Sequence, residues 1–196
     1  IRDQALAVSG LLSQKMYGPS VMPFLPEGAW GVVYPQYTKV HWELSDGEDR
    51  HRRALYTYWK RTSPYPSMMA FDSQSRDLCV SRRIRTNTPL QALVLLNDPV
   101  YVEAANALAR LMEEVGQGDL HKAITYGYKK ALCKEADEET IQLLQDLYKG
   151  MGTDEAKAMP IHYTPEPKKD QVKDFNGPMA VVANAILNLD AFLVKN

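Results

Sequence analysis

The chain has 196 residues, of which 45% are hydrophobic and 24% are charged, and its formal net charge is −1. This is the composition of an ordinary globular protein, and the length suits one domain or one domain with an appendage. Its apolar runs are far shorter than the roughly 18 residues that a membrane-spanning helix needs, so we expect no membrane span. The chain starts at Ile1 without a methionine, and we expect it to be a piece of a longer protein.

The N-terminal residues have the period of an amphipathic helix. Apolar side chains recur at helical spacing, at Ile1, Ala5, Val8, Leu12 and Met16. This spacing predicts a helix over residues 1–16. Residues 17–87 lack the helical spacing of apolar side chains and are rich in prolines, glycines, aromatics and arginines. This composition predicts a loop-rich insert. Alternation in residues 39–44 favours a short extended piece, and a short β-hairpin is one option within the insert.

Helix-start signals begin at Thr88 and open a predicted helical core over residues 88–150. Pro89 follows the threonine and Gln91 stands three residues after it, the pattern of a capping box with proline at the first helical position. A second helix is predicted from Asp98-Pro99. Its predicted buried stripe consists of Tyr101, Ala105, Leu108, Met112 and Val115.

The end of this core is predicted to be a helical hairpin. Its two helices are residues 119–132 and 137–149, with Asp119 and Asp137 as N-caps and Gly150 as the stop. A short connection favours antiparallel packing of neighbouring helices.

Residues 151–176 contain prolines and lysines without a period, which predicts a mobile loop. Gly177-Pro178 is the predicted start of a last helix over residues 177–194. The predicted fold class is therefore mainly α, a single multi-helix domain with a long loop-rich insert.

Arginine is concentrated in one part of the chain, residues 50–85. Eight of the ten arginines lie there: Arg50, Arg52, Arg53, Arg61, Arg76, Arg82, Arg83 and Arg85. With Lys60, and against Asp72 and Asp77, this window has a net charge of +7, so the rest of the chain carries −8. A guanidinium group is always charged and offers a rigid fork of donors. The window therefore suits either anion capture or an internal polar framework.

The second half of the window leads into the predicted helix start at Pro89. Helix N-termini favour anions, and guanidinium groups bind carboxylate, sulfate or phosphate through paired hydrogen bonds. We therefore predict a ligand-binding site made of Arg76, Arg82, Arg83, Arg85, Asn87 and Thr88. The structural alternative is that the arginines pair with Asp72, Asp77 and backbone carbonyls to hold a long loop.

Residues 50–61 mix basic and aromatic side chains, a combination found in sites for nucleic acid and for sugars. The chain is slightly acidic and has no DNA- or RNA-binding signature. We therefore expect no nucleic-acid partner, whereas a sugar ligand stays open. Core aromatics with paired or solvated arginines are the structural alternative.

No motif identifies a catalytic residue. Cys79 has arginines nearby in sequence but no accompanying base, and the serines of the window lack a Gly-x-Ser-x-Gly elbow. The four histidines are scattered, and we expect neither a metal nor a cofactor in this chain. Cys79 and Cys133 could form one disulfide or could be two buried, unpaired thiols.

Several stretches of the chain are distinctive: RALYTYWKR at 53–61, Phe71-Asp72, CVSRRIRTNTPLQALVLLNDP at 79–99, and the shorter Ile1-Arg-Asp, Gly18-Pro-Ser-Val and Ile186-Leu-Asn-Leu-Asp. They resemble the DUF1553 family, also called PSD1, a domain of planctomycete-type proteins. The resemblance extends through most of the chain and is weaker at 29–48 and 151–176. The family pattern has a small residue, usually glycine, where this chain has Cys133, so the resemblance gives no support to a disulfide between Cys79 and Cys133.

The resemblance implies the C-terminal part of a DUF1553-like region in an exported protein, in the periplasm or at the cell surface. Such proteins usually pair this domain with a DUF1549 domain and often with a cytochrome c module. The family's activity is unassigned, so no catalytic residue can be transferred.

Together, the arginine window and the resemblance lead us to expect a non-catalytic domain. It would bind an anionic or sugar ligand, or dock a partner domain, through the arginine window. The alternative is part of an enzyme acting on polysaccharide, with its site completed by an N-terminal portion. Paired carboxylates in a cleft would favour that enzyme.

Overall fold

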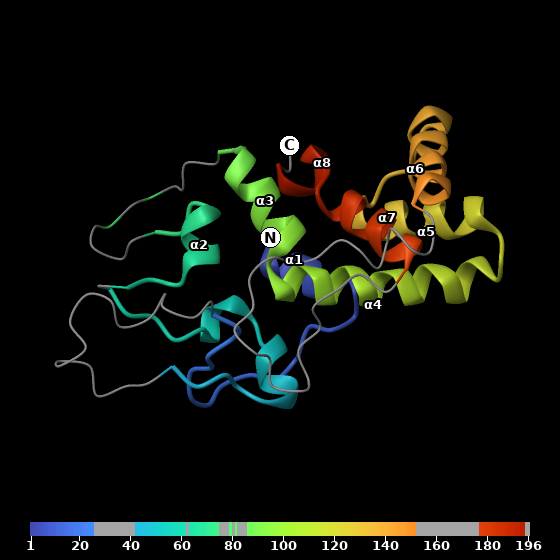
Figure 1. Cartoon of the computed structure of the whole chain (residues 1–196). Helices are drawn as coiled ribbons and strands as arrows, with labels where there is room; N and C mark the ends of the chain where they lie inside the picture. Colours follow the sequence, from blue (N-terminus) through green and yellow to red (C-terminus); the bar gives the residue numbers. More distant parts are fainter. Residues whose placement is uncertain are drawn as a thin grey trace.

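The computed structural model describes residues 1–25, 42–61, 63–74, 79, 81, 86–151 and 177–194. These residues are mainly helical, as predicted, and Figure 1 shows how the helices follow one another. The α-helices are α1 (Arg2–Val8), α2 (Pro66–Ala70), α3 (Pro89–Asn97), α4 (Pro99–Gly116), α5 (Leu120–Leu132), α6 (Glu138–Gly150), α7 (Pro178–Leu187) and α8 (Asp190–Leu193). Two short 3-10 helices, η2 (Gly47–His51) and η3 (Ala54–Tyr56), lie in the insert.

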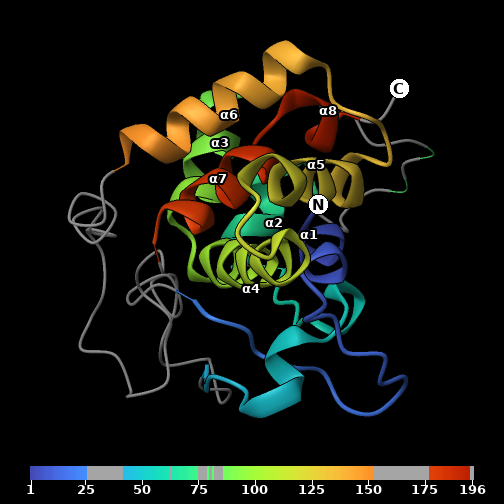
Figure 2. The same cartoon turned by 90° about the vertical axis from the view of Figure 1, so that its right-hand side faces the viewer.

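Helix α4 is the centre of the core and packs against α7, α5, α1 and α3. Figure 2 shows α4 nearly end-on, with the other helices around it. The predicted stripe of α4 is buried at Tyr101, Ala105, Leu108 and Met112, and Val115 is half-buried. Helix α7 is apolar on most of its surface and is buried accordingly, as expected for a helix with neighbours on several sides.

The hairpin of α5 and α6 forms with the predicted caps. Asp119 accepts from the Lys122 N–H and Asp137 from the Thr140 N–H. The two helices contact each other, but Figure 1 shows α6 standing steeply against α5 instead of running antiparallel beside it. The prediction of antiparallel packing was therefore wrong. Helix α6 also packs on α7.

The first helix is shorter than the predicted residues 1–16, because it ends at Val8. Gly10 adopts a left-handed conformation with φ of +79°. The Leu11 N–H then folds back to the Leu6 carbonyl at 2.9 Å, and the Gly10 N–H bonds to Ala7. This is the glycine-terminated helix end that satisfies the last carbonyls.

The predicted C-terminal helix over residues 177–194 is in fact two helices. The backbone becomes extended at Leu189 between α7 and α8. The break redirects the chain so that Phe192 is fully buried in the core. Burial of a large aromatic ring favours this break over a continuous helix.

The insert contains no hairpin among its described residues. Its one described β contact is a parallel bridge between Val21 and Thr57. Aromatic rings hold the segment together: Trp42 stacks on Tyr65 at 5.9 Å and meets Tyr58 edge-on at 6.5 Å. Of the predicted loop at residues 151–176, all but Met151 lies outside the described residues. Of the predicted extended piece at residues 39–44, only residues 42–44 are described, and they form no strand. Within the described ranges, no helix combines the length and hydrophobicity needed to cross a bilayer.

Candidate functional site at the base of the arginine segment

The predicted ligand site is described only in part. Arg76, Arg82, Arg83 and Arg85 lie outside the described residues, whereas Asn87 and Thr88 lie within them. The described residues on either side do show how the chain enters and leaves residues 73–85, which we call the arginine segment.

Asp72 ties the two ends of the arginine segment together. Its Oδ2 atom accepts the backbone N–H and the hydroxyl of Thr86, each at 2.8 Å. Asp72 itself has a left-handed backbone with φ of +56°, a conformation that aspartate tolerates better than most residues. The segment therefore starts and ends at the same place on the molecule.

Gln91 of α3 also hydrogen-bonds to the residues at the base of the arginine segment. Its side-chain amide donates to the Ala70 carbonyl at the end of α2 and to the Thr86 hydroxyl, both at 3.0 Å. The Gln91 side chain is buried, so its hydrogen bonds are shielded from water. The base of the segment is consequently fixed to both α2 and α3.

Thr88 caps α3 as the sequence predicts. Its hydroxyl accepts from the Gln91 N–H at 3.4 Å, and the Gln91 side chain accepts from the Thr88 N–H at 3.3 Å. Pro89 has no N–H, so the capping box occupies much of the donor capacity of the first turn. Anion binding at this position would therefore depend on guanidinium groups more than on the helix N-terminus.

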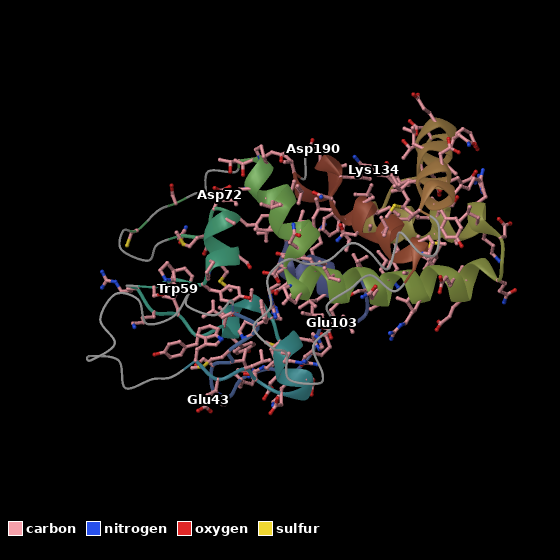
Figure 3. The ribbon with its side chains drawn as sticks, in the orientation of Figure 1. Glu43, Trp59, Asp72, Glu103, Lys134 and Asp190 are labelled. Atoms are coloured by element: carbon pink, nitrogen blue, oxygen red, sulfur yellow. The ribbon has the colours of Figure 1, made fainter. Side chains whose placement is uncertain are left out.

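The Asn87 side-chain amide donates a hydrogen bond to the carboxylate of Asp190, which is distant in sequence and lies at the start of α8. Figure 3 shows Asp72 and Asp190 on either side of α3. Thus the structure brings Asn87 and Thr88 together at the segment base, and each side chain has a protein partner.

In the first half of the arginine window, Arg52 stabilises the backbone of the insert. Arg52 is fully buried, and its guanidinium donates to the carbonyls of Tyr17 and Pro19, the latter at 3.0 Å. It also lies 4.0 Å from the centre of the Tyr56 ring. Arg2 donates at 2.7 Å to the carbonyl of Arg52 and, at the same distance, to that of Arg50. Arginine here organises the backbone of the insert.

An ion pair joins the insert to α4. The His51 Nε2 atom lies 3.0 Å from a carboxylate oxygen of Glu103, and Figure 3 shows Glu103 on the side of α4 that faces the insert. Burial alone would raise the pKa of Glu103, because it disfavours the charged carboxylate. The hydrogen bond and charge of His51, together with the charges of Arg50 and Arg2, have the larger combined effect, so the pKa of Glu103 is lowered.

A polar cluster at the start of α4 links α2 to the core. The Asp98 carboxylate accepts from the Ser67 hydroxyl at 2.5 Å and from the Val100 N–H at 3.0 Å. Burial raises the pKa of Asp98, in spite of these hydrogen bonds and nearby Arg2. Burial and the Asp98 charge also raise the pKa of both Tyr65 and Tyr101.

Sequence reasoning missed the roles of Arg2, Asp98 and Glu103. Arg2 and Glu103 stand outside the arginine window, and their partners are 48 or more residues away in sequence. Asp98 was recognisable as a helix cap from Asp98-Pro99, but its bond to α2 follows only from the fold.

Both cysteines are free and exposed. The disulfide alternative was therefore wrong, and the thiols are unpaired as the other alternative predicted, but they are not buried. Cys133 ends α5 in a left-handed conformation with φ of +56°. That conformation favours glycine and explains why a small residue suits this position.

The family comparison supports the resemblance seen in the sequence. The model of PSD1, described as a protein of unknown function (DUF1553), matches residues 1–148.

The chain belongs to the PSD1 family. The match includes the insert, the arginine segment and helices α1 to α5, and it reaches into α6. No curated protein and no solved structure matches the chain.

Proposed function

We propose that this PSD1 domain is a non-catalytic binding domain whose arginine segment captures anionic groups of a ligand or partner. The observation that carries the proposal is the closure of the segment base by Asp72 and Thr86. A closed base supports ligand binding because it concentrates positive charge at one place and reduces the entropy lost on binding.

Both ends of the arginine segment are fixed by described contacts. Asp72 accepts two hydrogen bonds from Thr86, and Gln91 donates to the Ala70 carbonyl and to the Thr86 hydroxyl. The four arginines in the sequence of this segment therefore belong to a loop whose two ends lie together.

The charge of the segment is not balanced locally. Residues 73–85 contain four arginines and only Asp77 as an acid, a net charge of +3. Asp72, next to the segment, already accepts two hydrogen bonds from Thr86. The acid that precedes the segment is thus engaged in closing the base. The net positive charge of the segment's sequence suits an external carboxylate, sulfate, phosphate or acidic sugar.

The wider setting follows from family membership and is also a proposal. We place the domain in an exported multidomain protein, with DUF1549 or cytochrome c modules of the same protein as candidate partners. Docking of such a module through its carboxylates and binding of a free anionic ligand use the same chemistry.

The test is titration with sodium sulfate and sodium phosphate, followed by NMR shifts of the Thr86–Gln91 amides. We expect saturable shifts at low salt that weaken in about 0.5 M sodium chloride, because an open ionic site is screened. The double variant Arg82→Gln/Arg83→Gln should weaken binding at least about fivefold. Arg110→Gln, an exposed arginine on α4, is the matched control and should leave binding unchanged. Equal effects of both variants, or no saturable shift, would overturn the proposal.

A further inference from the structure

The part of the insert that precedes α2 is hydrogen-bonded within itself. Two described stretches, residues 13–25 and 42–58, make up this part, which we call the insert unit. The Val21 N–H donates to the Tyr56 carbonyl and the Tyr58 N–H donates to the Val21 carbonyl, both at 2.8 Å. Three further hydrogen bonds join the same two stretches, from Ser13 to His51, from Ser45 to Met22 and from Trp42 to Pro23. The insert unit therefore satisfies many of its own backbone groups.

Two charged side chains at the start of α1 hold the insert unit from outside. The Arg2 guanidinium, which is 7% exposed, donates at 2.7 Å to the carbonyl of Arg52 and at the same distance to that of Arg50. The Asp3 carboxylate accepts from the Ala54 N–H, also at 2.7 Å. Both contacts end on the backbone of one short stretch of the insert unit, so α1 holds that stretch at several points.

The insert unit contributes nothing to the described hydrophobic core. Among the described residues, neither the core cluster nor the partly buried apolar side chains packed against it include a member of the insert unit. Its described contact with α4 is the ion pair between His51 and Glu103 at 3.0 Å. A hydrogen bond contributes a modest net free energy, because water replaces it when it breaks. A part of a protein that is attached in this way opens at a lower cost than the core.

One edge of the insert unit has a different kind of attachment. The Trp42 ring stacks on the Tyr65 ring at 5.9 Å, and the Tyr65 hydroxyl donates to the Phe24 carbonyl at 2.6 Å. Tyr65 is buried and directly precedes α2, whose Ser67 hydroxyl donates to Asp98. This edge combines aromatic packing with hydrogen bonds, so it suits a pivot.

From this contrast we infer that the insert unit is a hinged flap. It opens from α1 and α4 as a folded body about Tyr65, and its latch consists of Arg2, Asp3 and Glu103. Figures 1 and 2 show the insert on the side of α4 opposite α6 and α7, so the flap can move without disturbing those helices. The open form is the minor state of the unmodified chain, and the hinge absorbs the change in backbone angles.

Distances between two spin labels, measured by pulsed electron paramagnetic resonance on the full chain, test the inference. Cys133 is exposed at the end of α5 and provides a label site on the core once Cys79 is changed to serine. Leu55→Cys, at a position that is 68% exposed, provides a label site on the insert unit. The latch variant Arg2→Met/Glu103→Ala should add a second distance in at least about a tenth of the molecules. A single, unchanged distance in this variant overturns the inference.

A label pair inside the insert unit distinguishes opening of the flap from its unfolding. Met16→Cys and Glu43→Cys are at exposed positions in the two stretches, and both native cysteines are changed to serine in this pair. The distance between these labels should be the same with and without the latch variant. If it broadens together with the first distance, the insert unit unfolds instead of opening as a folded body, and the inference fails.

Controls separate the latch from general effects of substitution. Arg110→Met/Glu113→Ala changes the same residue types at exposed positions of α4 and should leave both distances unchanged. Equal second populations in the control and the latch variant would also overturn the inference. Should Arg2→Met prevent folding, Glu103→Ala alone should still give a smaller second population, because it removes one latch contact, and its absence overturns the inference.

The inference is independent of the proposed function, because the base of the arginine segment is fixed to α2 and α3 and not to the latch. Sulfate-induced shifts of the Thr86–Gln91 amides should therefore be equal in the latch variant and the unmodified chain. Sulfate binding together with an insert unit that never opens rejects the flap alone. Opening of the flap without sulfate binding rejects only the proposed function.

Discussion

Arginine residues in this protein differ in role according to what surrounds them. Arg52 is buried among the carbonyls of Tyr17 and Pro19 and under the Tyr56 ring. Arg2 bridges two further carbonyls of the insert. A guanidinium can do this because its five donors lie in one plane and its charge is more weakly hydrated than that of lysine. Arg52, in the first half of the arginine window, and Arg2, outside it, are consequently committed to folding.

Asp98 gives a residue-scale prediction about pH. Because burial raises its pKa in the folded state, folding favours the protonated carboxyl, and the free energy of unfolding falls as pH rises from about 3.8 through the raised pKa. Asparagine is also a good N-cap and can donate to Ser67. We therefore expect Asp98→Asn to be increasingly more stable than the unmodified chain as pH rises through this interval, in urea unfolding curves. If the difference in free energy of unfolding between the variant and the unmodified chain stayed constant from pH 3.5 to 7, the prediction would be contradicted.

At the scale of elements, the hairpin between α4 and α5 depends on close backbone approach. A Cβ atom added to Gly116 would lie 2.7 Å from the Ala123 Cβ and 3.3 Å from its Cα. Neither atom can move without shifting a helix. The glycine at the end of α4 is thus a packing requirement, whereas the left-handed residues that end the helix are Gln117 and Gly118.

Gly116→Ala should therefore destabilise the protein by about 1–3 kcal/mol, the usual cost of overpacking. The matched control is Gly150→Ala at the end of α6, where an added Cβ meets nothing within 4 Å. That change should be neutral or stabilising by a few tenths of a kcal/mol. Thermal and urea unfolding of both variants measures the contrast, and equal midpoints would refute the packing argument.

The capping box of α3 gives a second prediction for an element. Thr88→Ala removes the acceptor for the Gln91 N–H and should cost about 1 kcal/mol of stability. Thr88→Ser retains the hydroxyl and should recover most of it. Because the Gln91 side chain also holds Thr86, the alanine variant should shift the Thr86 amide signal in NMR spectra. An unchanged unfolding midpoint would show that the cap contributes nothing.

For the whole molecule, the insert and the helical core are joined by polar contacts that span long sequence distances. The Ala54 N–H donates to Asp3 at 2.7 Å, Ser67 donates to Asp98, and His51 pairs with Glu103. Apolar packing dominates elsewhere in the core. The attachment of the insert should therefore respond to pH more than the core does.

Glu103→Gln tests this attachment. The pKa of Glu103 is lowered in the folded state, so its carboxylate contributes stability above the unfolded pKa of about 4.5, and this is lost as pH falls through the lowered value. The variant should be about 1 kcal/mol less stable near pH 6, and the difference should shrink as pH falls towards 3. Glu113→Gln, an exposed change on the same helix, should show no such trend.

Local sequence signals determined much of the helical core. The caps at Thr88, Asp119 and Asp137 form as predicted, and Asp98 caps α4 at its predicted start. Each cap depends on atoms within three residues of it. The buried stripe of α4 was also readable, since the 3.6-residue period reports which face of a helix is buried.

Tertiary structure alone decided the rest. The break before α8 depends on a place for Phe192 in the core. Composition could show that arginines are concentrated in residues 50–85, but not that Arg52 is buried beneath Tyr56 or that Asp72 closes onto Thr86. Those outcomes depend on partners 4 to 35 residues away in sequence, and only the folded chain brings such partners together.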